Sequence, residues 1–236
     1  MGRAYEVRKA AIQKNGAAKA KLYSNFAKEI YIAAKSGGTN IEANDKLKSL
    51  VEKAKKNQVP SDIINRAIDK VNSGVNEDYQ SLRYEGFGPG ASTVIVDCLT
   101  DNVNRTVGFV RPAFTKCNGK LGVTNSVSHF YENLAIFSVK DSTEEEVFEI
   151  LMNEGVDVKD IETDENEVII TADAKEYNNV KKALTSANLN IDLDEVSMVA
   201  LDKVKLEGED LELFNKLMNM LDEIEDVQNV YHNVEL

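Results

Sequence analysis

The chain has 236 residues, 42% hydrophobic and 29% charged, which are the proportions of a soluble globular protein. It contains no run of about 18 apolar residues, so no membrane-spanning helix is expected. The N-terminus lacks the apolar segment of a secretory signal, and the chain has only two cysteines, Cys98 and Cys117. We therefore expect a cytoplasmic protein with reduced thiols.

The net charge of −12 is unevenly distributed along the chain. Residues 1–72 hold 15 Lys and Arg against 7 Asp and Glu, whereas residues 131–236 hold 8 against 28. A basic segment attached to an acidic body predicts that nucleic acid, if it binds, contacts the N-terminal part.

Three short amphipathic helices are predicted in the basic segment, over residues 17–35, 44–57 and from Ser61, an expected N-cap, to about residue 73. In the first helix Lys21, Lys28 and Lys35 are seven residues apart and form one row. Helical geometry places this row opposite Phe26 and Ile30. We therefore expect it to face away from the core and towards phosphate.

The candidate phosphate contacts extend beyond that row. The expected contacts are Lys14, Lys21, Lys28, Lys35, Lys48, Lys55, Arg66, Lys70 and Arg83. The first turn of the third helix, Asp62 to Ile64, offers no set of polar base-reading side chains. Contact with the nucleic-acid backbone therefore fits better than sequence readout.

From residue 92 onwards the pattern alternates between strands and helices. Strands are predicted at 92–100, within 120–130, at 135–140, around 156–161, at 167–171 and at 227–234, and the region 191–206 is long enough for two strands. With the predicted helices, the order is β-α-β, then β-α-β-β-α-β, then β-α-β. The helix over 104–116 contains Pro112, which predicts a bend or a late start. The helix after residue 140 is expected to open with a capping box formed by Ser142 and Glu145.

This order predicts an α+β fold with two ferredoxin-like α/β domains, one inserted into the other. The predicted domains are a basic helical domain over 1–75, a discontinuous α/β domain over 76–132 and 200–236, and an acidic inserted α/β domain over 133–199.

The sequence RYEGFGPG, residues 83–90, resembles a phosphate loop, but it lacks the required context. Its glycine-rich part, Gly86 to Gly90, is expected to follow a loop and precede a strand, whereas phosphate loops open a helix. We therefore predict a structural turn in which Pro89 fixes φ and Gly90 is left-handed. His129 and His232 are far apart, and no nucleophile–base pair or metal cluster is evident, so no enzyme activity, metal or cofactor is expected.

Several segments carry a family resemblance, and together they run through nearly the whole chain: KEIYIAAKSGG, KAKKNQVPSDIINRAIDK, RYEGFGPG, DNVNRTVGFVRPAF, GKLG, NSVSHF and VQNVYHNV. The chain resembles the YebC family, in a branch with a shorter N-terminal tail, since it begins MGRAY and has no Trp. The resemblance implies three domains, the third inserted in the second, and a regulatory role. The motif residues that it carries over are Arg83, Tyr84, Gly86, Phe87, Gly88, Pro89, Asn104, Arg105 and Thr106.

Three functional hypotheses follow. The first is a probable transcriptional regulator that binds DNA through the basic helical domain. The alternative is a ribosome-associated translation factor that binds ribosomal RNA, with Tyr23, Tyr31 or Phe87 as stacking platforms. The third is a protein- or ligand-binding module, in which the acidic domains recognise a basic partner. In the first two, Arg83 and Phe87 are expected to assist the basic surface.

Overall fold

The structure is a computed structural model, and it describes residues 19–74 and 77–235. Lys14 lies outside the described residues. Among the described residues, no helix is both long enough and apolar enough to cross a membrane.

The N-terminal unit is a bundle of three helices, α2 (Lys19–Gly37), α3 (Asp45–Lys56) and α4 (Ser61–Asn72), with a 3-10 turn η2 (Ile41–Ala43) between the first two. Ile30, Leu47 and Ala54 are fully buried at its centre. Asn44 caps α3 by accepting a hydrogen bond from the Leu47 amide at 3.1 Å. The N-cap expected at Ser61 is wrong: Ser61 is the first helical residue, and Pro60 precedes it without a side-chain cap.

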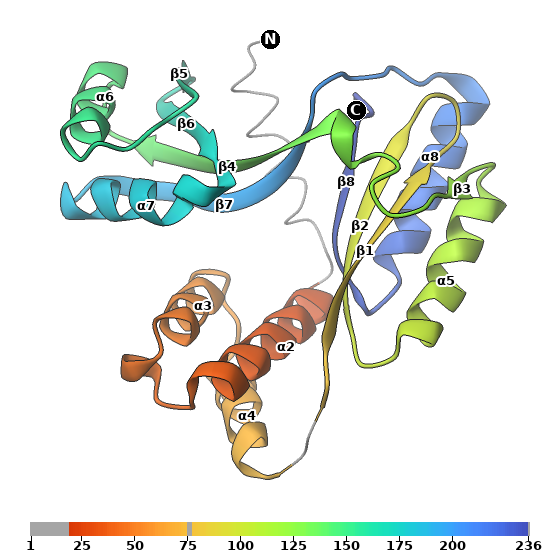
Figure 1. The fold of residues 1–236 in the computed structure, drawn as a ribbon, viewed down its shortest axis with the longest axis horizontal. Coiled ribbons are helices and arrows are strands. Elements are labelled where there is room, and N and C mark those ends of the chain that lie inside the picture. Colours follow the sequence, from red (N-terminus) through yellow and green to blue (C-terminus); the bar gives the residue numbers. More distant parts are fainter. Residues whose placement is uncertain (1–18, 75–76, 236) are drawn as a thin grey trace.

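The first sheet has four antiparallel strands in the order β3-β1-β2-β8. They are β1 (Gln80–Phe87), β2 (Thr93–Thr100), β3 (Lys120–Leu121) and β8 (Val227–His232). Two helices, α5 (Val103–Lys116) and α8 (Gly208–Asp222), cover one face (Figure 1). Val94, Val96 and Cys98 on β2 pack against Phe114 and Phe214 of these helices, so this layer has its own core.

The second sheet lies in the chain between β3 and α8, and its strand order is β5-β6-β4-β7. Its strands are β4 (Tyr131–Lys140), β5 (Asp160–Asp164), β6 (Glu167–Asp173) and β7 (Asn190–Ala200), with helices α6 (Glu144–Asn153) and α7 (Tyr177–Ser186). The chain order β-α-β-β-α-β with this strand order is the ferredoxin-like arrangement. The predicted α+β fold is confirmed: the structure has a helical unit and two four-stranded sheets.

The first sheet reaches a similar arrangement by a different connectivity. The segment 83–87, expected as a loop, belongs to strand β1, and only one strand forms within residues 191–206. Along β1, Leu82 and Tyr84 pack into the core while Arg83 and Phe87 are exposed. This alternation is typical of a strand, and the glycines that follow it suggested a loop instead.

Two smaller expectations about helix starts also differ. Helix α5 begins at Val103, where Asn102 accepts a hydrogen bond from the Arg105 amide, so the late start considered for Pro112 is wrong. Helix α6 is capped by Thr143, which accepts from the Glu146 amide at 3.3 Å. Ser142 lies one residue too early to cap, and it donates instead to the Glu146 carboxylate.

Candidate nucleic-acid interface

The α2 lysine row, Lys21, Lys28 and Lys35, faces carboxylates of the body. Lys21 pairs with Asp222 at 3.1 Å, Lys28 with Asp226 at 3.4 Å and Lys35 with Asp78 at 2.8 Å. The expectation of a solvent-facing row is wrong, because Lys28 is buried between α2 and the α8–β8 turn. Helical spacing showed that the row points away from the core of its own helical unit. It could not show that carboxylates from other segments of the chain pack against that side.

Asp226 is the centre of this contact. Its carboxylate accepts hydrogen bonds from Arg105 Nη2 at 3.0 Å and from Thr106 Oγ1 at 2.9 Å, in addition to Lys28. Burial alone would raise the pKa of Asp226, but the bonds from Arg105 and Thr106 outweigh it and hold that pKa below its ordinary value. Asp226 is therefore an ionised, buried link between α2, α5 and β8.

Most of the other predicted cations are also paired within the chain. Arg83 binds Asp97 in a bidentate pair across β1 and β2, with Nε–Oδ1 2.6 Å and Nη2–Oδ2 2.8 Å. The remaining pairs are Lys48 with Glu42, Arg66 with Asp62 and Lys70 with Glu77. These side chains are partly or fully exposed, so phosphate can compete with their partners.

Helix α3 carries five lysines, the α3 lysines: Lys46, Lys48, Lys53, Lys55 and Lys56. Lys53 donates to the carbonyl of Asp194 at 3.4 Å, and Lys56 to that of Ile191 at 3.3 Å, so one side of α3 touches the edge strand β7. Lys46 and Lys55 have no carboxylate partner within the described part of the chain. Lys55 was predicted as a contact, and Lys46 was not.

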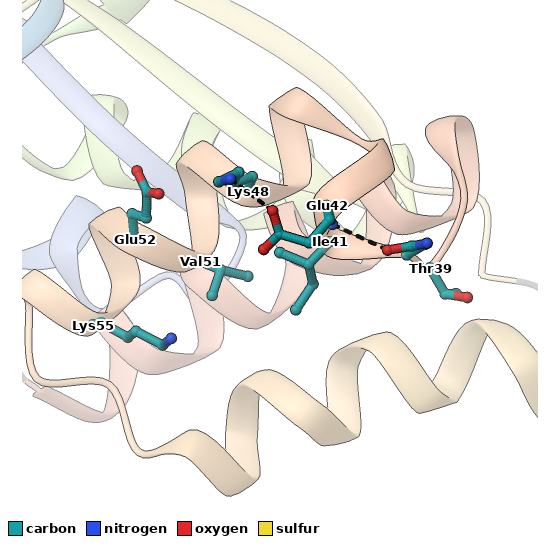
Figure 2. Close-up of a pocket in the computed structure, with 8 residues that line it drawn as sticks. Thr39, Ile41, Glu42, Lys48, Val51, Glu52 and Lys55 are labelled. Carbon is teal, nitrogen blue, oxygen red and sulfur yellow. Dashed lines mark hydrogen bonds and ion pairs between the residues drawn. The ribbon is translucent and has the colours of Figure 1, made fainter.

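Two grooves flank α3. One, of about 440 Å³, is lined by Lys48, Lys55, Val51 and the η2 turn, and Figure 2 shows Ile41 and Val51 between the charged groups. The other, of about 530 Å³, lies between α2, α3 and the strands β1, β2 and β8, with Lys46 and Arg83 among its lining residues. The exposed positive charge of the helical unit is therefore concentrated on α3 rather than on α2.

The comparisons with known proteins agree with this three-part structure. Residues 3–74 match the TACO1/YebC protein N-terminal domain, and residues 79–234 match the TACO1/YebC second and third domain. The chain belongs to the TACO1/YebC family. The resemblance to YebC drawn from the motifs is thereby confirmed.

Individual relatives in the TACO1/YebC family match over nearly the full length. The chain is 49% identical over 235 residues to a probable transcriptional regulatory protein of Pseudoalteromonas atlantica, covering 99% of this chain and 97% of the relative. It is 48% identical over 238 residues to one of Vibrio parahaemolyticus, covering 100% of both. The crystal structure of a conserved hypothetical protein from Aquifex aeolicus has a TM-score of 0.75 at 34% identity, covering 94% of this chain and 92% of that one.

The TACO1/YebC motif residues around the β1–β2 turn have structural roles. Gly88 donates to the Ser92 carbonyl at 2.9 Å, and Ser92 Oγ donates to the Pro89 carbonyl at 2.7 Å. Gly90 has a φ of +61°, so the predicted left-handed turn is confirmed. A Cβ on Gly86 would lie 2.6 Å from Phe114 Cε1, which explains the requirement for glycine there.

The remaining motif residues divide between core and surface. Tyr84 is half-buried against the first core, while Phe87 and Asn104 are exposed. Arg105 and Thr106 hold Asp226, as described above. The motif on α5 therefore supports the contact between the helical unit and the body. A contact between this motif and nucleic acid is not needed to explain why Arg105 and Thr106 are present.

Two carboxylates with structural roles, Glu85 and Asp226, were missed from the sequence. Glu85 accepts hydrogen bonds from the amides of Asn125, Val127 and Ser128 at 2.8–2.9 Å, and from Ser128 Oγ at 2.6 Å. Burial would raise its pKa, but these bonds hold the pKa below the ordinary value. The position of Glu85 inside RYEGFGPG was a usable signal. Asp226 had none among the 40 acidic residues.

In the part of the chain that the structure describes, the titratable groups give no sign of a metal centre. No cluster of three or more His, Cys, Asp or Glu able to hold a metal ion occurs in residues 19–74 and 77–235. Cys98 and Cys117 are free and buried, and burial raises the pKa of the Cys98 thiol to about 12. Cys98 is therefore a protonated core residue at neutral pH.

Proposed function

We propose that this chain is a nucleic-acid-binding regulator of gene expression that contacts phosphate through the α3 lysines. The names of its relatives, probable transcriptional regulatory proteins, support a regulatory role. The observation that carries the proposed contact is the concentration of five lysines on the twelve residues of α3, next to two open grooves. The proposal assigns the protein no catalytic step.

The contact is assigned to α3 rather than α2 because of the partners each helix has. The α2 lysine row is bound to Asp222, Asp226 and Asp78, so using Lys28 would leave a buried carboxylate short of a cation. Among the described residues, Lys46 and Lys55 have no such carboxylate to lose. They can therefore neutralise phosphate and release its counterions at little expense to the fold.

DNA is the first target that follows from the relatives' names, and RNA is the second candidate. One observation favours RNA. In the first turn of α4, Ser61 to Ile64, the Asp62 carboxylate is exposed but forms an ion pair with Arg66, so it is not free to contact a base edge. A helix that reads the major groove typically offers polar side chains to base edges at its N-terminal end. Recognition by backbone contact and shape is the expected mode on either target.

The test compares two double variants of the full chain for binding to duplex DNA and to RNA of the same sequence. Lys46→Gln with Lys55→Gln removes two unpaired cations of α3, and Lys21→Gln with Lys35→Gln removes two paired cations of α2. We expect the α3 variant to lower the slope of log affinity against log salt by about 2 on duplex DNA, and the α2 variant to leave it nearly unchanged.

Equal slopes for the wild type and the α3 variant would overturn the α3 contact. The preferred nucleic acid is the one bound more tightly at the same salt concentration. If the wild-type chain binds neither duplex DNA nor RNA, and a basic protein partner binds the acidic segment over 133–199, the alternative of a protein-binding module replaces this proposal.

A further inference from the structure

The segment between Asp101 and Glu132 contains no acidic residue. Thirty consecutive residues, 102–131, lack Asp and Glu, although the chain has 40 of them in 236 residues and a stretch of this length would hold about five on average. The same segment carries Arg105, Arg111, Lys116 and Lys120. We call it the acid-free segment. In a chain of net charge −12, it is a local exception that the charge of the N-terminal unit does not explain.

In the structure this segment forms α5, β3, the loop after β3 and the turn η3 (Ser128–Phe130), at the side of the first sheet away from α3 (Figure 1). Arg105 is occupied by Asp101 and Asp226. Arg111, Lys116 and Lys120 are exposed and have no carboxylate partner among residues 19–74 and 77–235. Positive charge is therefore left over on this side of the body.

None of the five acids at positions 77–101, which precede the segment, pairs with Arg111, Lys116 or Lys120. Glu77 is paired with Lys70, Asp78 with Lys35 and Asp97 with Arg83. Glu85 is bound by the loop amides, and Asp101 by Arg105. At the β1–β2 turn, beyond the cations of the acid-free segment, the acidic side chain of Asp210 on α8 lies beside Gly90.

An aromatic ring stands beside one of these cations, and two further rings lie in the turn η3 near the end of the segment. Phe87 is the register partner of Lys120 across β1 and β3, so the two side chains share one face of the sheet. Phe87 and Phe130 are each 43% exposed, and the ring of His129 lies 3.9 Å from that of Phe130, centroid to centroid. Exposed rings next to unpaired cations are the combination that single-stranded nucleic acid requires: stacking for bases and positive charge for phosphates.

The loop between β3 and η3 is held in place. The Glu85 carboxylate fixes the backbone at Asn125, Val127 and Ser128, between Lys120 and Phe130. Val123, in the same loop, is 78% exposed, so the loop also offers apolar contact. A surface that is ordered before binding loses less entropy when it binds.

We propose that the acid-free segment, together with Phe87, is a binding surface for single-stranded nucleic acid that wraps around the β3 edge of the first sheet. Arg111, Lys116 and Lys120 contact phosphates, and Phe87 and Phe130 stack against bases. This inference rests on the proposed nucleic-acid-binding function and adds a second contact, remote from α3, that selects unpaired strands.

The test measures binding of the full chain to an oligoadenylate RNA of about 15 nucleotides and to a duplex of the same length, by fluorescence anisotropy over a range of salt concentrations. The charge variant is Arg111→Gln, Lys116→Gln and Lys120→Gln together. Its matched control is Lys175→Gln, Lys182→Gln and Lys205→Gln, which removes the same charge from exposed lysines elsewhere. A third variant, Phe87→Leu, removes a ring and keeps an apolar side chain. Thermal melts verify that each variant folds.

The charge variant is expected to lower the salt slope on oligoadenylate by about 2, since each phosphate contact on a single strand contributes about 0.7. Phe87→Leu is expected to weaken binding to the single strand about fivefold, with the slope unchanged, and to leave duplex binding unaltered. The control triple variant is expected to bind as the wild type does.

Each contrary outcome has a separate meaning. If the charge variant binds oligoadenylate like its control, the second surface is wrong, and the α3 contact stands or falls by the Lys46 and Lys55 variant alone. If poly-glutamate competes as well as oligoadenylate and Phe87→Leu has no effect, the surface recognises an acidic polypeptide and the proposal is overturned. If the wild type binds no nucleic acid at all, both proposals fail.

Discussion

Lys28 of α2 and Asp226 of the α8–β8 turn face each other at 3.4 Å, and their side chains are only 10% and 6% exposed. The pair joins residues 198 positions apart, one from the basic unit and one from the acidic body. A buried ion pair of this kind is weak evidence for net stabilisation, but removing one partner leaves a buried charge without compensation. The uneven charge distribution of the chain therefore serves, in part, to hold its own units together.

Replacing Asp226 by Asn is expected to destabilise the protein by about 3 kcal/mol, because Lys28, Arg105 and Thr106 all lose the carboxylate. Lys28→Met should cost less, since Asp226 keeps its bonds from Arg105 and Thr106. Urea unfolding measures both, and the double variant should cost less than the sum of the single variants. Asp222→Asn, at the exposed C-terminal end of α8, serves as control, with a change below about 1 kcal/mol. Additive effects of the two buried variants would show that they do not interact.

Glu85→Gln is expected to loosen the loop from Asn125 to Ser128. The variant loses the charge that four donors share, so unfolding should become easier by about 2 kcal/mol. Hydrogen exchange at the amides of Val127 and Ser128 should accelerate, while exchange in the second sheet stays as in the wild type. The control Glu145→Gln changes an exposed residue of α6. Unchanged protection of these two amides in the Glu85 variant would contradict the role assigned to this carboxylate.

Two glycine substitutions should have opposite effects. A Cβ at Gly86 would meet Phe114 Cε1 at 2.6 Å and the Lys120 carbonyl at 2.9 Å, so Gly86→Ala should destabilise by about 2 kcal/mol through overpacking. A Cβ at Gly108, inside α5, would meet nothing within 4 Å. Gly108→Ala should therefore stabilise the protein by up to about 1 kcal/mol, through the better helix propensity of alanine. Thermal unfolding of the two variants would refute the packing argument if both shifts had the same sign.

His232 is expected to make stability depend on pH between about 6.5 and 4. Burial lowers the pKa of His232 to about 4, and its ring packs edge-on against Phe214 at 5.1 Å. Below the unfolded-state pKa of about 6.5, the unfolded chain takes up a proton that the folded state does not. The free energy of unfolding therefore decreases as the pH is lowered, and at pH 5 the loss relative to pH 7 is about 2 kcal/mol.

The variant His232→Phe cannot take up this proton, so its unfolding free energy should change less between pH 7 and pH 5 than that of the wild type. Carboxylates whose pKa is lowered, among them Glu85 and Asp226, lose their contribution to stability mainly below about pH 4.5, and both proteins contain them, so they do not obscure the comparison. Parallel pH dependences for the two proteins would mean that His232 is accessible to protons in the folded state.

Local patterns in the sequence determined the fold class, because they depend on neighbours along the chain. Along α2, Phe26, Ile30 and Ala33 recur at helical spacing, and they are buried in the core of the bundle. The β-α-β-β-α-β order of the inserted unit, and the left-handed Gly90, follow from turn and period signals of the same kind. Strand β1 was the exception, because its exposed Arg83 and the glycines after it obscured the alternation.

Only the tertiary structure decided which charges are free. Lys28 and Lys46 are alike in sequence, each on a basic amphipathic helix, yet one is buried against Asp226 and the other is exposed beside a groove. Glu85 likewise differs from the other carboxylates only through four donors more than 39 residues away in the chain. Charge is a property of the residue, whereas pairing is set by contacts between distant segments. The sequence therefore determined the α+β fold and the basic unit, and the packing of the units determined which of its lysines remain available to a partner.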